Sequence, residues 1–217
     1  MTITERKQLI KELIQQDKYP DALIECSNLF KDDPKDQENI KQFLFLFNRI
    51  NDGNYEFEPE TPEQFVMRGV AKFYNQEFED SIYDFEKALA LDSKHHYALR
   101  TRAFSLKFLG KFDEAISDLN TAIEIQPTGE YYDDLSELYQ ILSEYKTALK
   151  YHQLAIEISP ADTRLWYNYG VDLAVCGYLE DAMVKYNKAI ELWPQYEDAI
   201  VNRNIIIESL KRSFFTI

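Results

Sequence analysis

The feature that most constrains this chain is a repeat of about 34 residues. Four alanines mark it, spaced 34, 33 and 34 residues apart: Ala88, Ala122, Ala155 and Ala189. Seven residues before each alanine stands a small residue, and five residues after it stands a proline or a serine. Self-similarity at this period indicates a helical solenoid, in which a unit can bury its apolar face only against its neighbours.

Residues 163–196 carry the repeat most fully. We count Thr163 as position 1. Large or small apolar residues then stand at seven positions: Trp166 (4), Tyr169 (7), Gly170 (8), Leu173 (11), Ala182 (20), Tyr186 (24) and Ala189 (27). A proline, Pro194, stands at position 32. Helical periodicity places the first four on one face of a helix and the next three on one face of a second helix. Gly177 marks the turn between them, and the proline ends the second helix.

These eight positions resemble the tetratricopeptide repeat (TPR), a helix-turn-helix unit with this spacing. The resemblance implies an all-α fold, a right-handed α-solenoid of stacked units with a C-terminal closing helix. We expect three segments. Residues 1–61 hold a degenerate N-terminal unit (3–34), an extra helix (36–50) and an acidic loop (51–61), and residues 62–196 hold four units (62–95, 96–128, 129–162, 163–196). Residues 197–217 form a closing helix with a polar outer face (197–212) and an apolar tail.

Composition narrows the partners. The 217 residues carry 38 acidic and 24 basic side chains, a formal net charge of −14. Such a chain repels nucleic-acid phosphates and anionic lipid headgroups, so we expect neither nucleic acid nor membrane as a partner. The first residues lack the pattern of a signal peptide and no window has 18 apolar residues. Two cysteines far apart, Cys26 and Cys176, are expected to be reduced thiols, which favours a cytoplasmic location.

The residue types that carry catalysis are absorbed by the repeat. All six glycines fall at turns, close-packing positions or the acidic loop, which leaves none for a phosphate-binding loop. His95 and His96 are adjacent and so diverge, a poor geometry for a metal. His152 stands at position 24, where a satisfied core histidine is expected. We therefore expect no cofactor, no metal and no catalytic residue, and hence no enzyme.

Two departures from the repeat occur together. Arginine stands at position 7 only in the units from 62 and 96, as Arg68 and Arg102, and only these units have aspartate at position 23, as Asp84 and Asp118. We expect Arg68 to pair with Asp84 or a neighbour, and Arg102 with Asp84 or Asp118. Such buried pairs are predicted to tie neighbouring units together.

In TPR proteins, positions 2, 5, 6, 9, 12 and 13 of the first helices line a concave groove, so the resemblance implies a binding surface here. The candidate groove residues are Val66, Val70, Tyr74, Arg100, Phe104, Lys107, Phe108, Asp134, Glu137, Arg164, Tyr167 and Asn168. In the unit from 129 this stripe is acidic, and it also includes Glu130 and Asp133. Two alternatives stay open: the phenylalanines pack between adjacent first helices, or the cations belong to an ordinary solvated face. The pattern by which co-chaperone TPRs hold a carboxylate is absent in both possible frames.

The sequence therefore predicts a non-enzymatic scaffold or adaptor that binds a peptide or helical segment in the TPR groove. The acidic stripe of the unit from 129 favours a partner with a basic segment. The alternative is a self-assembling structural protein that forms homo-oligomers through its end helix or through the apolar tail with Phe214, Phe215 and Ile217.

Overall fold

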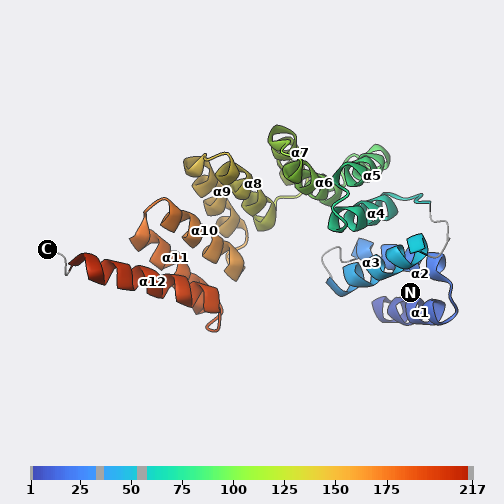
Figure 1. Cartoon of the computed structure of the whole chain (residues 1–217), viewed down its shortest axis with the longest axis horizontal. Coiled ribbons are helices and arrows are strands. Elements are labelled where there is room, and N and C mark those ends of the chain that lie inside the picture. Colours follow the sequence, from blue (N-terminus) through green and yellow to red (C-terminus); the bar gives the residue numbers. More distant parts are fainter. Residues whose placement is uncertain (1, 33–36, 53–57, 215–217) are drawn as a thin grey trace. The chain divides into compact units, whose positions relative to one another are not determined.

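The computed structural model describes residues 2–32, 37–52 and 58–214 (Figure 1). In these residues it has twelve α-helices and no strand, which confirms the all-α prediction. The chain forms two compact units, Met1–Ala122 and Ile123–Ile217, and each is described by itself. Residues 53–57 of the expected acidic loop and 215–217 of the expected tail lie outside the described residues, and residues 51 and 52 belong to a helix.

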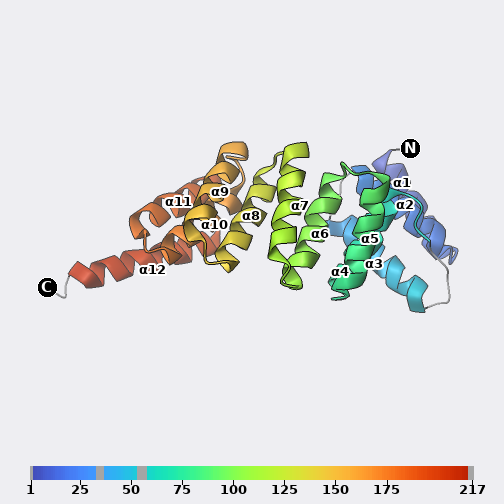
Figure 2. The ribbon, with the colours of Figure 1, turned by 90° about the horizontal axis from the view of Figure 1, so that it is seen from above.

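Unit 1 contains α1 (Ile3–Gln15), α2 (Tyr19–Asp32), α3 (Gln37–Asp52), α4 (Pro62–Tyr74), α5 (Phe78–Leu91), α6 (His96–Phe108) and α7 (Phe112–Ile125), whose last turn passes the unit boundary. Helices α4 to α7 lie side by side, as Figure 2 shows. The expected extra helix is α3.

Unit 2 contains α8 (Gly129–Ile141), α9 (Tyr145–Ile158), α10 (Thr163–Val175), α11 (Leu179–Leu192) and α12 (Glu197–Phe214). The closing helix α12 packs against α11. Its outer face is mixed: Asn204 and Lys211 are exposed, as expected, but so are the apolar Val201 and Ile205.

Each hairpin turns at one residue with a left-handed backbone. Positive φ occurs at one residue in each of five turns: Asp17, Gln76, Gly110, Ser143 and Gly177. The last four recur with the 34-residue period. This conformation reverses the chain between the two helices of a repeat, and glycine adopts it without the steric penalty that other residues incur.

Small residues at position 8 allow close packing of the two helices of a repeat. A Cβ at Gly69 would lie 2.6 Å from Phe85 Cε1, and a Cβ at Gly170 would lie 2.6 Å from Tyr186 Cε1. Both rings are buried. These two repeats therefore combine a glycine in the first helix with an aromatic ring in the second, as predicted for close-packing positions.

The predicted ion pairs form, but within a repeat. Arg68 on α4 pairs with Asp84 on α5 at 2.7 Å, and Arg102 on α6 pairs with Asp118 on α7 at 2.7 Å. Each pair joins the two helices of one hairpin, so the expectation that they tie neighbouring units together is corrected. The physical reason is that positions 7 and 23 face each other across the same hairpin.

Candidate functional site

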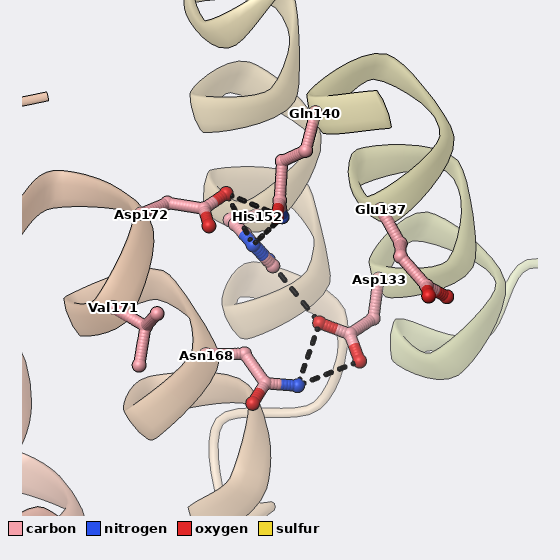
Figure 3. Close-up of a pocket in the computed structure, with 7 residues that line it drawn as sticks. All are labelled: Asp133, Glu137, Gln140, His152, Asn168, Val171 and Asp172. Carbon is pink, nitrogen blue, oxygen red and sulfur yellow. Dashed lines mark hydrogen bonds and ion pairs between the residues drawn. The ribbon is translucent and has the colours of Figure 1, made fainter. Parts of the chain in front are cut away.

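A hollow of about 210 Å³ opens between α8 and α10, over α9 (Figure 3). We call it the acidic pocket and define it by its lining residues: Asp133, Glu137, Gln140, His152, Asn168, Val171 and Asp172. All seven belong to unit 2. The pocket lies on the first helices of two successive repeats, the face on which the groove is expected.

Helical spacing brings the lining residues together. Asp133, Glu137 and Gln140 are four and three residues apart on α8, so they share one face of that helix. Asn168 and Asp172 are four residues apart and share a face of α10. His152 comes from the middle of α9, which packs against both helices.

A buried histidine occupies the bottom of this pocket. The residue is 1% exposed, and its Nε2 lies 2.8 Å from Asp172 Oδ2. The same carboxylate oxygen accepts a hydrogen bond of 2.8 Å from Gln140 Nε2 and a longer one of 3.4 Å from Ser136 Oγ. Asp172 is therefore well satisfied, and His152 is held in a fixed orientation.

The second ring nitrogen of His152 is held less well. Nδ1 lies 3.2 Å from Asp133 Oδ1, close enough for electrostatic attraction, but it makes no hydrogen bond of good direction. Asp133 instead accepts two hydrogen bonds from Asn168 Nδ2, at 3.0 and 3.2 Å. The pocket thus contains a buried ring nitrogen without a hydrogen-bond partner.

The pocket carries net negative charge. Burial alone lowers the pKa of His152, but interaction with Asp133 and Asp172 outweighs it and raises the pKa from 6.5 to about 9. One imidazolium stands against three carboxylates, those of Asp133, Glu137 and Asp172, and none of the seven lining residues is lysine or arginine. The pocket therefore attracts a cation.

Unit 1 presents an aromatic cluster at the ends of α4 and α6 and the start of α5. It comprises Phe73, Tyr74, Phe78 and Phe108. The Phe78 and Phe108 rings stack at 4.9 Å, and Phe73 meets Phe108 edge-on at 5.5 Å. Phe108 is nevertheless 59% exposed. Large exposed rings of this kind are common at protein interfaces.

Comparison with known proteins identifies the repeat. The sequence profile described as "Tetratricopeptide repeat" matches residues 101–128. The chain is 25% identical over 149 residues to human Tetratricopeptide repeat protein 13, which covers 65% of the chain and 17% of that protein. It is 25% identical over 135 residues to human Tetratricopeptide repeat protein 6, which covers 62% of the chain and 26% of that protein.

The chain is an all-α solenoid of TPR-type repeats. Its solved structural neighbours have the same all-α solenoid fold. They include YrrB, described as a TPR protein with an unusual peptide-binding site (TM-score 0.55, 22% identity, covering 76% of the chain and 83% of YrrB), and MamA (TM-score 0.57, 18% identity, covering 88% and 95%). The chain spans only 17% and 26% of the length of these two human relatives.

Two of the TPR groove residues predicted in unit 1 are core residues instead. Val66 and Val70 on α4 are 0% and 7% exposed. They belong to the same apolar cluster as Phe43 and Leu46 of α3. Because the extra helix packs against α4, these valines are covered rather than open to a ligand.

The remaining TPR groove residues predicted in unit 1 gather on α4 and α6. Tyr74 and Phe108 are exposed in the aromatic cluster. Arg100 lies over the Phe104 ring at 5.1 Å, and Lys107 lies over the same ring at 5.2 Å. The packing of Phe108 against Phe73 of the neighbouring first helix supports the alternative that this phenylalanine packs between helices, although much of its ring stays open.

In unit 2 the predicted TPR groove residues have polar partners within the chain. Arg164 pairs with Asp162 at 3.0 Å and with Glu130 at 3.4 Å. The hydroxyl of Tyr167 accepts a hydrogen bond of 3.1 Å from Asn202 on α12. Of the five residues predicted here, Glu137 and Asn168 line the acidic pocket, and Asp134 is half-buried beside it on α8.

Sequence reasoning missed His152 and the residues that hold it in the pocket. Gln140 and Asp172 were not among the candidates, and His152 was assigned to the core with no functional part. Asp133 was recognised only as part of an acidic stripe. A usable signal was present, because Asp172 interrupts the apolar run Gly170–Leu173 at a position that faces a histidine in the preceding helix.

The described residues show neither a cluster of metal ligands nor a membrane-spanning helix. In that part of the chain, no group of three His, Cys, Asp or Glu side chains has the arrangement of a metal site. None of the described helices combines the length and apolar character needed to cross a bilayer.

Proposed function

We propose that this TPR protein is a scaffold that binds a segment of another protein, a peptide or a helix, on the face of its first helices. The acidic pocket is the observation that carries the proposal. It is a concave, charged site on the face that the repeat leaves open, and its groups converge from two successive repeats. Binding without catalysis is the proposed role.

The charge of the pocket favours a partner with a basic segment. Three carboxylates converge there without a lysine or arginine among the lining residues. The chain as a whole carries a net charge of −14, which speeds the approach of a basic partner at low salt. We therefore expect binding to weaken as ionic strength rises.

The aromatic cluster of unit 1 supports a second contact area for the same class of partner. Phe108 and Tyr74 offer exposed ring surface. Aromatic rings contribute much of the binding energy in protein interfaces. The name of YrrB, a TPR protein with an unusual peptide-binding site, is consistent with a peptide ligand here as well.

The proposal is tested by capture of partners with two variants that make the same charge reversal. Glu137→Lys reverses one charge of the acidic pocket, and Glu180→Lys reverses an exposed charge on α11 outside it. We expect proteins that bind wild type to be lost with Glu137→Lys and retained with Glu180→Lys. Identical partner lists for the two variants, quantified by mass spectrometry, would contradict the proposal.

A second candidate is self-assembly through the closing helix. Val201 and Ile205 on α12 are 53% and 61% exposed, and a hollow of about 550 Å³ runs beside them. Apolar groups left open on an end helix favour docking of another chain. Light scattering over a concentration series tests this: we expect a mass increase that Ile205→Lys removes, and a monomer at every concentration would contradict it.

The location of the protein stays a prediction. Both cysteines are free thiols in the structure. That state is compatible with the cytoplasmic location that we propose from the sequence.

A further inference from the structure

Nδ1 of His152 is the unexplained atom of the acidic pocket. It is buried, it belongs to a residue that lines the pocket, and it has no hydrogen bond of good geometry. Buried polar atoms in folded proteins nearly always have a partner, and an unsatisfied one loses free energy. A ring nitrogen without a hydrogen-bond partner, in a residue that lines a hollow, can be completed by a donor group that enters the hollow.

The groups around the hollow define what can enter. Two carboxylates, of Asp133 and Glu137, line it together with His152, whose Nδ1 lies 3.2 Å from Asp133 Oδ1. When the ring is neutral and Nε2 keeps its proton toward Asp172, Nδ1 carries a lone pair. The pocket then offers three acceptor groups, two carboxylates from α8 and one ring nitrogen from α9. A primary ammonium has three N–H donors and no acceptor, so it matches this set.

Space and apolar surface fit the same ligand. The hollow of about 210 Å³ is many times the space that one water needs. Val171 is the one apolar residue in its wall, and it offers a surface for methylene groups. A lysine side chain has an alkyl stem of this kind below its charged head.

We infer that the acidic pocket receives the ammonium group of a lysine side chain in the partner segment, and that this lysine displaces the proton from Nδ1 of His152. The inference rests on the proposed function and names the chemistry of its ligand. The ammonium donates to Asp133, to Glu137 and to Nδ1. The alkyl stem contacts Val171.

The proton balance of this exchange is complete. Before binding, both ring nitrogens carry protons, one toward Asp172 and one toward Asp133. On binding, the Nδ1 proton passes to the solvent buffer, the Nε2 proton stays on its hydrogen bond to Asp172, and the lysine keeps all three of its own. One positive charge, on the ammonium, replaces another, on the imidazolium. The net charge of the pocket is therefore unchanged, and its carboxylates still have a cation beside them.

The surroundings of His152 make the exchange measurable at neutral pH. With a pKa of about 9 in the free protein, the ring is charged at pH 7, so a proton is present to be displaced. The titratable groups that face it are Asp133 and Glu137 from α8 and Asp172 and Tyr169 from α10, whose ring stacks on the imidazole at 5.8 Å. Tyr151 is adjacent on α9, and burial raises the pKa of both tyrosines, which stay neutral.

Lysine fits the acceptors better than arginine. A guanidinium is planar and prefers two parallel hydrogen bonds to one carboxylate. Here Asn168 already occupies one lone pair on each oxygen of Asp133. Three separate acceptors suit the tetrahedral head of an ammonium.

The direct test observes the ring nitrogens of His152 by ¹⁵N NMR on the full chain at pH 7. The probe is a blocked pentapeptide, Gly-Gly-Lys-Gly-Gly, at millimolar concentration, and the matched control carries acetyl-lysine. The chain has three histidines, and the His152 signals are those missing in His152→Gln. We expect the lysine peptide to convert His152 saturably from imidazolium to the neutral form protonated at Nε2, with His95 and His96 unchanged. The acetyl-lysine peptide is expected to have no effect.

Calorimetry in two buffers with different ionisation enthalpies gives a second readout. We expect close to one proton released per lysine bound at pH 7, and an association constant that rises by up to about tenfold per pH unit between pH 7 and 8.5. Glu137→Gln, an exposed position, is expected to weaken lysine binding severalfold. Glu180→Gln, outside the pocket, is expected to leave it unchanged.

Several results would overturn the inference: no saturable binding of the lysine peptide, binding without proton release, or the same response to acetyl-lysine. A stronger response to the equivalent arginine peptide would overturn the choice of lysine. The failure of the inference is distinct from that of the proposed function. Loss of partners with Glu137→Lys, together with an unresponsive His152, leaves the scaffold proposal in place and removes the lysine.

Discussion

The guanidinium of Arg68 donates two hydrogen bonds to the carboxylate of Asp84, from Nε to Oδ2 at 3.0 Å and from Nη2 to Oδ1 at 2.7 Å. Asp84 is completely buried, and Lys72 Nζ lies 2.9 Å from its Oδ2. Arg102 and Asp118 repeat the two-point geometry one repeat later, with both distances at 2.7 Å. Each pair fastens the first helix of a repeat to the second.

Removal of the buried carboxylate is expected to destabilise α4 and α5 strongly. Asp84→Asn keeps the size of the side chain but removes the buried carboxylate that Arg68 and Lys72 share, and leaves Arg68 only the longer, exposed contact with Glu58 at 3.7 Å. Loss of one partner from a buried ion pair destabilises by about 3–5 kcal/mol. We expect a lower thermal midpoint and faster hydrogen exchange in α4 and α5.

A matched control separates burial from charge. Asp80→Asn makes the same change on α5 at an exposed position and should shift stability by less than about 1 kcal/mol. An equal effect of the two variants would mean that the Arg68–Asp84 pair does not hold the hairpin together.

This pair also indicates how far sequence reasoning reaches. The joint occurrence of arginine at position 7 and aspartate at position 23 in two repeats was enough to predict the pairing. It was not enough to decide whether the pair lies within a repeat or between repeats, because both arrangements bring those faces close. The structure decides for the single hairpin.

Other features depended on packing that a repeat pattern does not contain. Val66 and Val70 occupy groove positions by count, yet α3 packs against their helix and buries them. The acidic pocket required knowledge of which residue faces His152. Repeat position placed that histidine in the core, but only three-dimensional neighbours show that it stands between two aspartates.

His152 makes stability dependent on pH in the alkaline range. The pKa of this histidine is raised from 6.5 to about 9 in the folded protein, so folding favours its charged form. That contribution is fully present below pH 6.5 and is lost as the pH rises through about 9. The shift corresponds to a contribution of about 3 kcal/mol.

The measurement compares thermal midpoints of wild type and His152→Gln at pH 6 and pH 9.5. We expect a large difference at pH 6 that shrinks at pH 9.5, while alkaline effects elsewhere in the chain cancel in the comparison. A difference that is constant with pH would show that His152 is not charged in the folded state.

A left-handed residue in a turn offers a stabilising change. Ser143 has a φ of 62° at the position where neighbouring repeats have Gly110 and Gly177. Glycine adopts this conformation without the penalty of about 1–2 kcal/mol that a Cβ incurs, although it gains entropy in the unfolded chain. We expect Ser143→Gly to stabilise by about 0.5–1 kcal/mol in chemical denaturation. The control introduces glycine inside α9, at exposed Lys150. We expect Lys150→Gly to destabilise by about 1 kcal/mol. Stabilisation by Lys150→Gly would count against the conformational explanation.

Gly170 tests whether close helix packing, rather than helix propensity, sets the residue at position 8. Glycine to alanine inside a helix ordinarily stabilises by about 1 kcal/mol. At Gly170 the added Cβ would lie 2.6 Å from Cε1 and 2.8 Å from Cδ1 of buried Tyr186, whose ring also packs against Tyr167. The ring cannot move freely, so we expect Gly170→Ala to destabilise by about 1–3 kcal/mol. Tyr186→Leu removes the ring. In a Tyr186→Leu background, adding Gly170→Ala should therefore cost less stability than Gly170→Ala costs in the wild type. Stabilisation by Gly170→Ala in the wild-type background would mean that α10 and α11 have room to separate, and that propensity outweighs packing at this position.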